Sequence, residues 1–221
     1  MAEYKTSKIS KNKIIDTCKE LFYLQGYKKT TYVDICNKAN SNPGLINYYF
    51  KTKKNIAGLI YGDFFVHIKD AVKKYMLETY NCYDLQYGTT LELRVFTYLL
   101  DNNPMLKNFY YDICNEGIEY DIEVVYHFYK LHVDEYNLNL SEDEIKLIQT
   151  AVVGSGIGIT KRNVEGFFNC DTSVIFNFRI KSMFSLMGVT PERVNEILSE
   201  TEKMFSKMEI ELNDYFLVTV K

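Results

Sequence analysis

Apolar residues recur every three or four positions along most of the chain, which is the spacing of one face of an α-helix. Three prolines, eleven glycines and few alternating runs also favour helices over strands in these 221 residues. The pattern predicts helices over residues 7–24, 32–39, 43–50, 53–80, 91–102, 104–116, 119–136, 141–166, 171–187 and 191–213. The last seven residues, from Tyr215, fit either a strand or an extended tail. We therefore expect an all-α protein.

Two short predicted helices near the N-terminus are joined by a tight turn at Asn40–Ser41. The second begins with Asn42 and Pro43, because asparagine caps a first turn well and proline fits the first helical position. Ile46 and Phe50 are four residues apart and would anchor this helix to its neighbours. The faces that remain carry Asn47, Tyr48 and Tyr49. This order of helix, turn and outward-facing helix predicts a helix-turn-helix.

The first of the two short helices follows a helix that ends at Gly26, a residue that readily takes the left-handed conformation. Thr30 or Thr31 caps it, since both are good N-cap residues. The residues expected to face inward are Val33, Cys36 and Ala39. A fourth helix, capped by Thr52, then continues without proline and would link the head to the rest of the chain.

The net charge of −3 is divided unevenly along the chain. Residues 1–62 contain 11 lysines and 4 acidic residues, which gives +7, whereas residues 63–221 contain 15 basic and 25 acidic residues, which gives −10. A basic head on an acidic body fits a phosphate-facing module attached to a module with another role. The same asymmetry would fit an arm that lies on a membrane surface. The helix-turn-helix favours DNA as the partner of the head.

The motif residues of the head resemble the signature of TetR-type (TetR/AcrR) transcriptional regulators over roughly residues 10–60. The matching positions are Gly26, Thr30, Thr31, Val33, Asp34, Ile35, Ala39, Gly44, Ile46, Tyr49, Phe50, Lys51 and Lys53. Asn40 departs from the pattern, since these proteins usually have glycine there. Lys54 and Asn55 stand where acidic residues commonly open the fourth helix, which weakens the helix-dipole support.

The resemblance implies a helix-turn-helix DNA-binding domain over residues 1–52 and a larger helical ligand-binding and dimerisation domain over residues 53–221. It implies a cytoplasmic homodimer that represses transcription from a palindromic operator in double-stranded DNA and is released by a small-molecule ligand. By the same resemblance and the chemistry of base edges, the DNA base contacts would come from Pro43, Gly44, Asn47 and Tyr48. The phosphate contacts would come from Lys28, Thr31, Tyr49 and Lys53.

The head contains no arginine, because all four arginines lie beyond residue 90. Arginine bound to guanine is the commonest specific base contact, whereas asparagine pairs with adenine. We therefore expect an operator that is rich in A·T pairs at the contacted positions.

The body is helical and of the length that the family has, but no residue there can be carried over from the family. A ligand pocket is expected between the helices of residues 60–160, and its candidate lining residues are His67, Arg94, Tyr98, Tyr110, Asn115, Tyr126 and His127. Small residues mid-helix allow a partner helix to approach closely, which suggests a dimer interface. Its candidate residues are Gly154, Gly156, Gly158, Val174, Phe178 and Ser185.

Other classes of function find little support. The five cysteines are scattered without a C-x-x-C pair, which fits reduced thiols in the cytoplasm, and the three histidines lack metal-ligand spacing. The G-x-G-x-G run at residue 154 follows no strand, so a dinucleotide site is not expected. With no catalytic constellation, signal peptide or membrane span, we expect neither an enzyme nor a cofactor. The alternative is a helical adaptor that binds protein without DNA.

Overall fold

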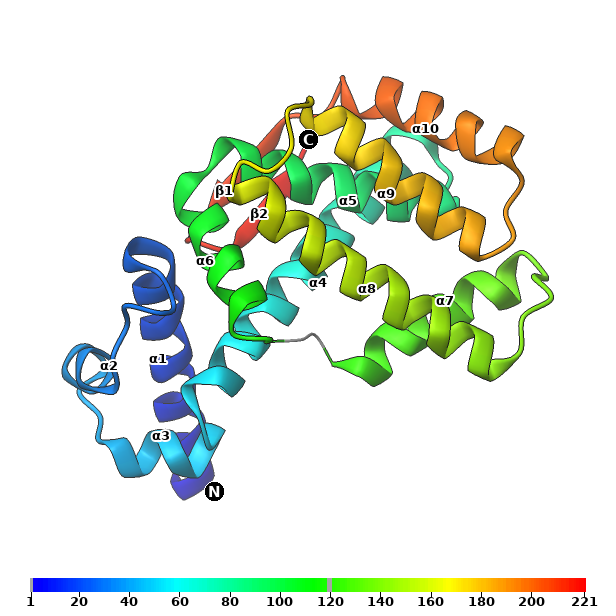
Figure 1. Cartoon of the computed structure of the whole chain (residues 1–221). Helices are drawn as coiled ribbons and strands as arrows, with labels where there is room; N and C mark the ends of the chain where they lie inside the picture. The colour runs from blue at the N-terminus through cyan, green and yellow to red at the C-terminus, as the bar shows by residue number, and fades with distance from the viewer. Residues whose placement is uncertain (1, 119–120) are drawn as a thin grey trace.

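The computed structural model describes residues 2–118 and 121–221, with side chains from residue 8 onward. Three helices form a head, and one long helix, α4, connects this head to a helical body (Figure 1). The helices are α1 (Ala2–Gln25), α2 (Tyr32–Ala39), α3 (Pro43–Phe50), α4 (Lys53–Tyr80), α5 (Leu85–Asn102), α6 (Pro104–Asn115), α7 (Ile122–Glu135), α8 (Glu142–Val164), α9 (Thr172–Leu186) and α10 (Pro191–Phe205). The predicted all-α class, with an N-terminal helix-turn-helix and a larger helical body, is confirmed.

The capping groups of the head form as the sequence predicts. The Thr31 hydroxyl accepts a hydrogen bond from the Asp34 amide, and the Asp34 carboxylate accepts one from the Thr31 amide. The Asn42 side chain accepts a hydrogen bond from the Leu45 amide and so starts α3. Asn40 ends α2 in the left-handed conformation at φ +47°, the role that glycine would otherwise have.

The inward face of α2 differs from the prediction. The expectation that Val33 faces inward is wrong, because its side chain is 66% exposed. Ile35 and Ala39 are buried instead, and Cys36 is half-buried. Since side chains four residues apart lie on one side of a helix, the face that meets α1 and α3 is the one that carries Ile35 and Ala39.

Several predicted helix ends are also shifted. α1 begins at Ala2 rather than at residue 7, and α5 begins at Leu85 rather than at residue 91. The earlier start of α5 has a clear cause, since the Asp84 carboxylate accepts a hydrogen bond from the Tyr87 amide at 2.9 Å and caps the first turn. The predicted start of a helix at Glu119 lies outside the described residues. From residue 121 onward, Asp121 caps α7.

The C-terminus forms a β-hairpin where the prediction extended α10 to residue 213. The strands β1 (Ile210–Asn213) and β2 (Leu217–Val220) pair antiparallel, with Ile210 opposite Val220. Asp214 and Tyr215 make the turn with positive φ angles of 41° and 69°. The final residues, which the sequence left as strand or tail, are therefore a strand that packs against α4.

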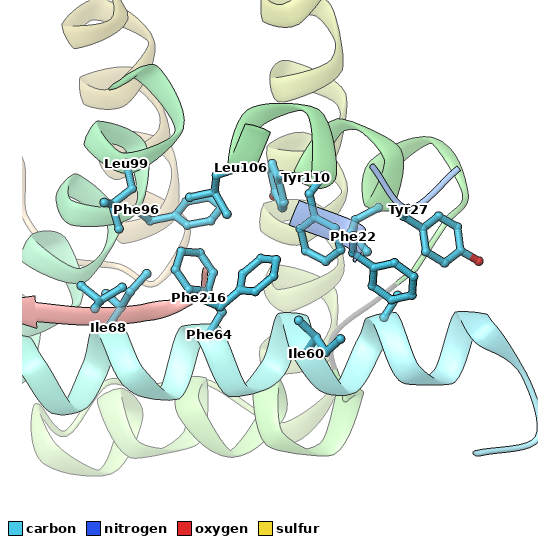
Figure 2. Packing of buried hydrophobic residues seen from close by; sticks show 14 of the residues in the cluster. Phe22, Tyr27, Ile60, Phe64, Ile68, Phe96, Leu99, Leu106, Tyr110 and Phe216 are labelled. Carbon is cyan, nitrogen blue, oxygen red and sulfur yellow. The ribbon is translucent and has the colours of Figure 1, made fainter. Parts of the chain in front are cut away.

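The hairpin inserts Phe216 into a core that head and body share (Figure 2). Its ring centroid lies 5.8 Å from that of Phe64 in α4, 4.9 Å from that of Phe109 in α6 and 5.9 Å from that of Tyr23 in α1. A second cluster of buried residues lies among α7, α8, α9 and α10. Across residues 2–118 and 121–221, no helix is both long and apolar enough to cross a membrane.

Candidate DNA-binding surface and body cavity

The exposed face of α3 carries the four candidate base-contacting residues. Pro43, Gly44, Asn47 and Tyr48 are all exposed, and the Tyr48 side chain retains 71% of its accessible surface. The opposite face is fixed to the head, because Ile46 and Phe50 are buried. This helix can therefore be approached along its outer side without disturbing the core.

The candidate phosphate-contacting residues surround the entrance to α2 and the end of α3. Lys28 and Thr31 are exposed, as is the neighbouring Lys29, and Tyr49 is half-buried with its ring against that of Tyr48. The Thr31 hydroxyl also donates a hydrogen bond to Asp34 at 2.7 Å. That hydrogen bond lowers the pKa of the Asp34 carboxyl, so a carboxylate caps the positive end of α2.

Lys53 has a more enclosed position than the other candidates. Its ammonium group donates hydrogen bonds to the carbonyl oxygens of Tyr27 (2.9 Å) and Thr30 (2.6 Å), and it lies 4.3 Å from the centre of the Tyr27 ring. Desolvation lowers the pKa of this ammonium, against the opposing effect of nearby acidic groups. Lys53 therefore fixes the segment that leads into α2, and its phosphate contact stays a prediction.

The body encloses a cavity of about 390 Å³ among α4, α5, α6, α7, α8 and α9. Aromatic rings form much of its wall, from Tyr61, Phe65, Phe96, Tyr110, Phe128 and Tyr129. Of the residues that the structure describes, Lys69, Glu92 and Arg179 are the charged ones that line it. A cavity of this size with an apolar wall and few polar groups is typical of a small-molecule site. A broader groove between α1 and the hairpin turn has mainly polar and charged residues in its lining, with the ring of Tyr215.

Of the seven residues predicted to line a pocket, Tyr110 lines this cavity. His67 faces the hairpin, where its Nδ1 lies 3.3 Å from the Phe216 carbonyl oxygen. The Arg94 guanidinium donates a hydrogen bond to the Leu198 carbonyl and covers the Phe176 ring at 4.4 Å. The other four also lie away from the cavity: Tyr98 packs on Phe205, Tyr126 on the second cluster, and Asn115 and His127 are exposed.

The residues that give the cavity its charge are not among those predicted from the sequence to line a pocket. Lys69 and Glu92 form an ion pair at 2.9 Å across α4 and α5, and Arg179 reaches the cavity from α9. One signal was available, because Tyr61, Phe65 and Lys69 are spaced four apart on α4 and so share a face.

Five of the six candidate dimer residues are exposed. Gly158 is exposed on α8, and Val174, Phe178 and Ser185 are exposed on the adjacent α9, whereas Gly154, also exposed, borders the body cavity. The side chains of Val174 and Phe178 are 54% and 60% exposed, which is unusual for such apolar groups in a pair of neighbouring helices. Gly156 is buried instead and lies against Arg179.

Helix α6 contacts both the head and the cavity. Its Asp112 carboxylate accepts a hydrogen bond from the Lys28 amide at 2.9 Å, and the side chain of its N-cap residue, Asn103, donates one to the Tyr23 hydroxyl at 2.6 Å. The same helix presents Tyr110 and Cys114 to the cavity. A shift of α6 would therefore also displace the segment that leads into α2.

The exposed α3 on a basic head, joined by a long helix to a helical body with an internal cavity, defines a helix-turn-helix protein of the class that includes many transcriptional regulators. The head of the chain is that of the TetR family. Residues 14–59 match the model of the family described as bacterial regulatory proteins, tetR family. These residues include α2 and α3 and end within the first turns of α4.

The HTH-type transcriptional regulator QacR of Staphylococcus aureus is 28% identical to this chain over 134 residues. The match covers 61% of this chain and 63% of that relative. Among solved structures, RolR in complex with resorcinol has a TM-score of 0.63 at 14% identity, covering 89% of this chain and 96% of that one. RolR without ligand has a TM-score of 0.55 at the same identity, covering 85% and 96%. At this identity the two structures show a shared fold.

Proposed function

We propose that this protein is a dimeric repressor of transcription that binds a palindromic operator through α3 and is released by a small molecule bound in the body. The exposed face of α3, which carries Gly44, Asn47 and Tyr48, is the observation that carries the proposal, together with the net charge of +7 over residues 1–62. Because Gly44 has no side chain, the backbone there can approach DNA closely, and the Asn47 side chain can pair with adenine. Lys28 and Thr31, near the start of α2, would hold phosphates and fix the register.

The test is binding to the DNA upstream of the protein's own gene, measured by fluorescence anisotropy over a range of salt concentrations. We expect tight binding that weakens steeply as salt rises, since lysine contacts to phosphate release counterions. Asn47→Ala should weaken specific binding by about 1–3 kcal/mol, whereas the matched control Asn195→Ala, exposed on α10, should not. Absence of any specific binding would discredit the repressor and favour a protein-binding adaptor.

We propose further that the exposed faces of α8 and α9 pair with the same faces of a second copy. Leu147, Val174 and Phe178 expose large apolar side chains there, and the exposed Gly158 allows a helix to approach closely. A four-helix arrangement made by two copies would bury these groups. Phe178→Glu should convert the dimer to a monomer in analytical ultracentrifugation, whereas Leu77→Glu, at another exposed apolar residue, on α4, should not. A Phe178→Glu dimer would contradict this interface.

The ligand would act by a population shift between two arrangements of the body helices. α4 and α6 line the cavity and also contact the head, so a ligand that favours one arrangement would change the spacing of the two recognition helices in a dimer. A coupling of about 1–3 kcal/mol suffices to change operator occupancy. The complex of RolR with resorcinol supports small-molecule binding in a body of this fold.

A further inference from the structure

The charged groups of the body cavity lie at two separate places. Tyr61 and Lys69 are eight residues apart on α4, so they mark positions about 12 Å apart along the helix axis. Lys69 pairs with Glu92 at one end, whereas Tyr61 and Tyr110, whose ring centroids are 5.5 Å apart, lie towards the other end with Arg179. The two ends therefore offer different chemistry to a ligand.

At the end that contains Lys69 and Glu92, the two opposite charges already balance each other. The Lys69 ammonium donates to the Glu92 carboxylate at 2.9 Å and also lies 4.6 Å from the centre of the Phe128 ring. Glu92 is buried, and its second oxygen accepts a hydrogen bond from the Tyr83 hydroxyl at 3.4 Å. Because both oxygens have partners, this carboxylate has little left to offer a cationic ligand.

The guanidinium of Arg179 has no such counter-ion. Within residues 8–118 and 121–221 no carboxylate forms an ion pair with it, and no side chain or carbonyl accepts a hydrogen bond from it. Asp101 lines a small neighbouring hollow that Arg179 also lines, and no ion pair joins these two side chains. Among the described residues, the half-buried Arg179 is thus held in the cavity wall without a carboxylate partner.

The position of Arg179 is built into the packing of α8 against α9. Gly156 is buried, and a Cβ atom there would lie 3.0 Å from Nη2 of Arg179, so the absence of a side chain makes room for the guanidinium. Burial raises the pKa of Tyr110 to about 12 and that of Cys114 to about 11, and the positive charge of Arg179 opposes both shifts. The positive charge of Arg179 therefore acts on Tyr110 and Cys114, two residues that line the cavity.

We propose that this cavity binds a flat, largely aromatic molecule that carries an acidic group, and that Arg179 pairs with that group. Among the described lining residues there are two cations and one carboxylate, a net charge of +1. The aromatic wall would hold the rings of the ligand, and the planar guanidinium suits a carboxylate that can accept two hydrogen bonds. The inference rests on the proposed function only in taking this cavity as the effector site.

Isothermal titration calorimetry of the full-length protein with three probes tests the charge preference. The probes are naphthalene-2-carboxylate, the neutral naphthalene-2-carboxamide and naphthalen-2-ylmethylammonium, which share their rings and differ in charge. We expect the carboxylate to bind with a dissociation constant below about 1 mM and at least about tenfold more tightly than the other two. Tighter binding of the ammonium, equal binding of all three, or no binding of the carboxylate in this range would overturn the proposal.

Variants of Arg179 test whether this side chain causes the preference for the carboxylate probe. Arg179→Gln should lower the affinity for the carboxylate by about tenfold and that for the carboxamide by less than about threefold, whereas Arg179→Lys should retain part of the preference. Arg162→Gln, at an exposed arginine of α8, is the matched control and should change neither affinity. An unchanged ratio in Arg179→Gln would overturn the assignment. Carboxylate binding that leaves operator binding unaffected would contradict the proposed release from DNA while leaving the ligand class intact.

Discussion

The carboxylate of Asp112 in α6 accepts a hydrogen bond from the backbone amide of Lys28 at 2.9 Å, which ties the wall of the body cavity to the segment that enters α2. Asp112 is buried, so its removal leaves the amide without a partner. We expect Asp112→Ala to lower the free energy of unfolding by about 1–3 kcal/mol and to weaken the response of DNA binding to ligand. Urea denaturation and anisotropy with ligand measure the two effects.

The exposed Asp70 of α4 provides the control for this variant, since Asp70→Ala removes a carboxylate without removing such a contact. An Asp112→Ala protein that matches Asp70→Ala in both stability and ligand response would show that the hydrogen bond does not connect the two parts.

Removal of the charge at Lys53 and at Lys29 should have different effects on DNA binding and on stability. Lys29 is exposed, so Lys29→Met should reduce the slope of the logarithm of affinity against the logarithm of salt concentration by about one. Lys53 is bound to two carbonyl groups, so Lys53→Met should lower the melting temperature and the DNA affinity with little change in slope. Lys74→Met, at an exposed lysine of α4, should alter none of these. A Lys53→Met slope reduced by about one would support the phosphate contact predicted from the sequence.

His132 should make the stability depend on pH. Burial lowers the pKa of its imidazole from 6.5 to about 4, and the neutral ring is held by Thr89 and the Phe128 carbonyl at 3.1 and 3.0 Å. Below pH 6.5 the unfolded chain binds a proton that the folded chain does not, so stability should fall as the pH drops from 6.5 towards 4, by at most roughly 3 kcal/mol.

Urea denaturation at pH 7.5 and pH 5 measures this dependence. His132→Gln should reduce the difference between the two pH values, whereas His127→Gln, at an exposed histidine five residues earlier on the same helix, should leave it unchanged. If the unchanged protein, His132→Gln and His127→Gln all show the same dependence of stability on pH, groups other than His132 are responsible.

Phe216 should contribute strongly to stability although it lies five residues from the end of the chain. Its ring is 1% exposed and packs against Phe64 and Phe109. Phe216→Ala should lower the free energy of unfolding by about 3–5 kcal/mol, because it leaves a cavity in the shared core. Leu217→Ala, at a partly exposed neighbour in β2, should have a much smaller effect in the same denaturation experiment. Similar losses in the two variants would assign the effect to the hairpin as a whole.

The head could be predicted closely because its signals are local. Thr31, Asn42 and Thr52 are N-cap residues, and the side chain of each accepts a hydrogen bond from the amide three residues later. The starts of α2, α3 and α4 therefore follow from the sequence. The exposure of Asn47 and Tyr48 then follows from the burial of Ile46 and Phe50 on the opposite face. Val33 was misplaced because an apolar residue in so short a helix does not identify the buried face by itself.

The cavity could not be predicted in the same way, because six helices distant in sequence contribute to it. Arg94 and Arg179 look alike in sequence, yet one covers a phenylalanine ring in the core and the other faces the cavity. The end of α10 was missed for a different reason. No glycine or proline separates Pro191 from Asn213, and apolar residues continue through Ile210 and Leu212, so the helical pattern gives no sign of the turn that follows Phe205.

The insertion of Phe216 into the shared core also has a consequence for the order of folding during synthesis. α1 is made first, but Tyr23 packs against two aromatic rings of the C-terminal hairpin, Tyr215 and Phe216. The surface on which the head docks is therefore incomplete until residue 216 has been made. A chain that is cut before this residue would carry a complete α3 on a head that lacks these two ring contacts with the hairpin.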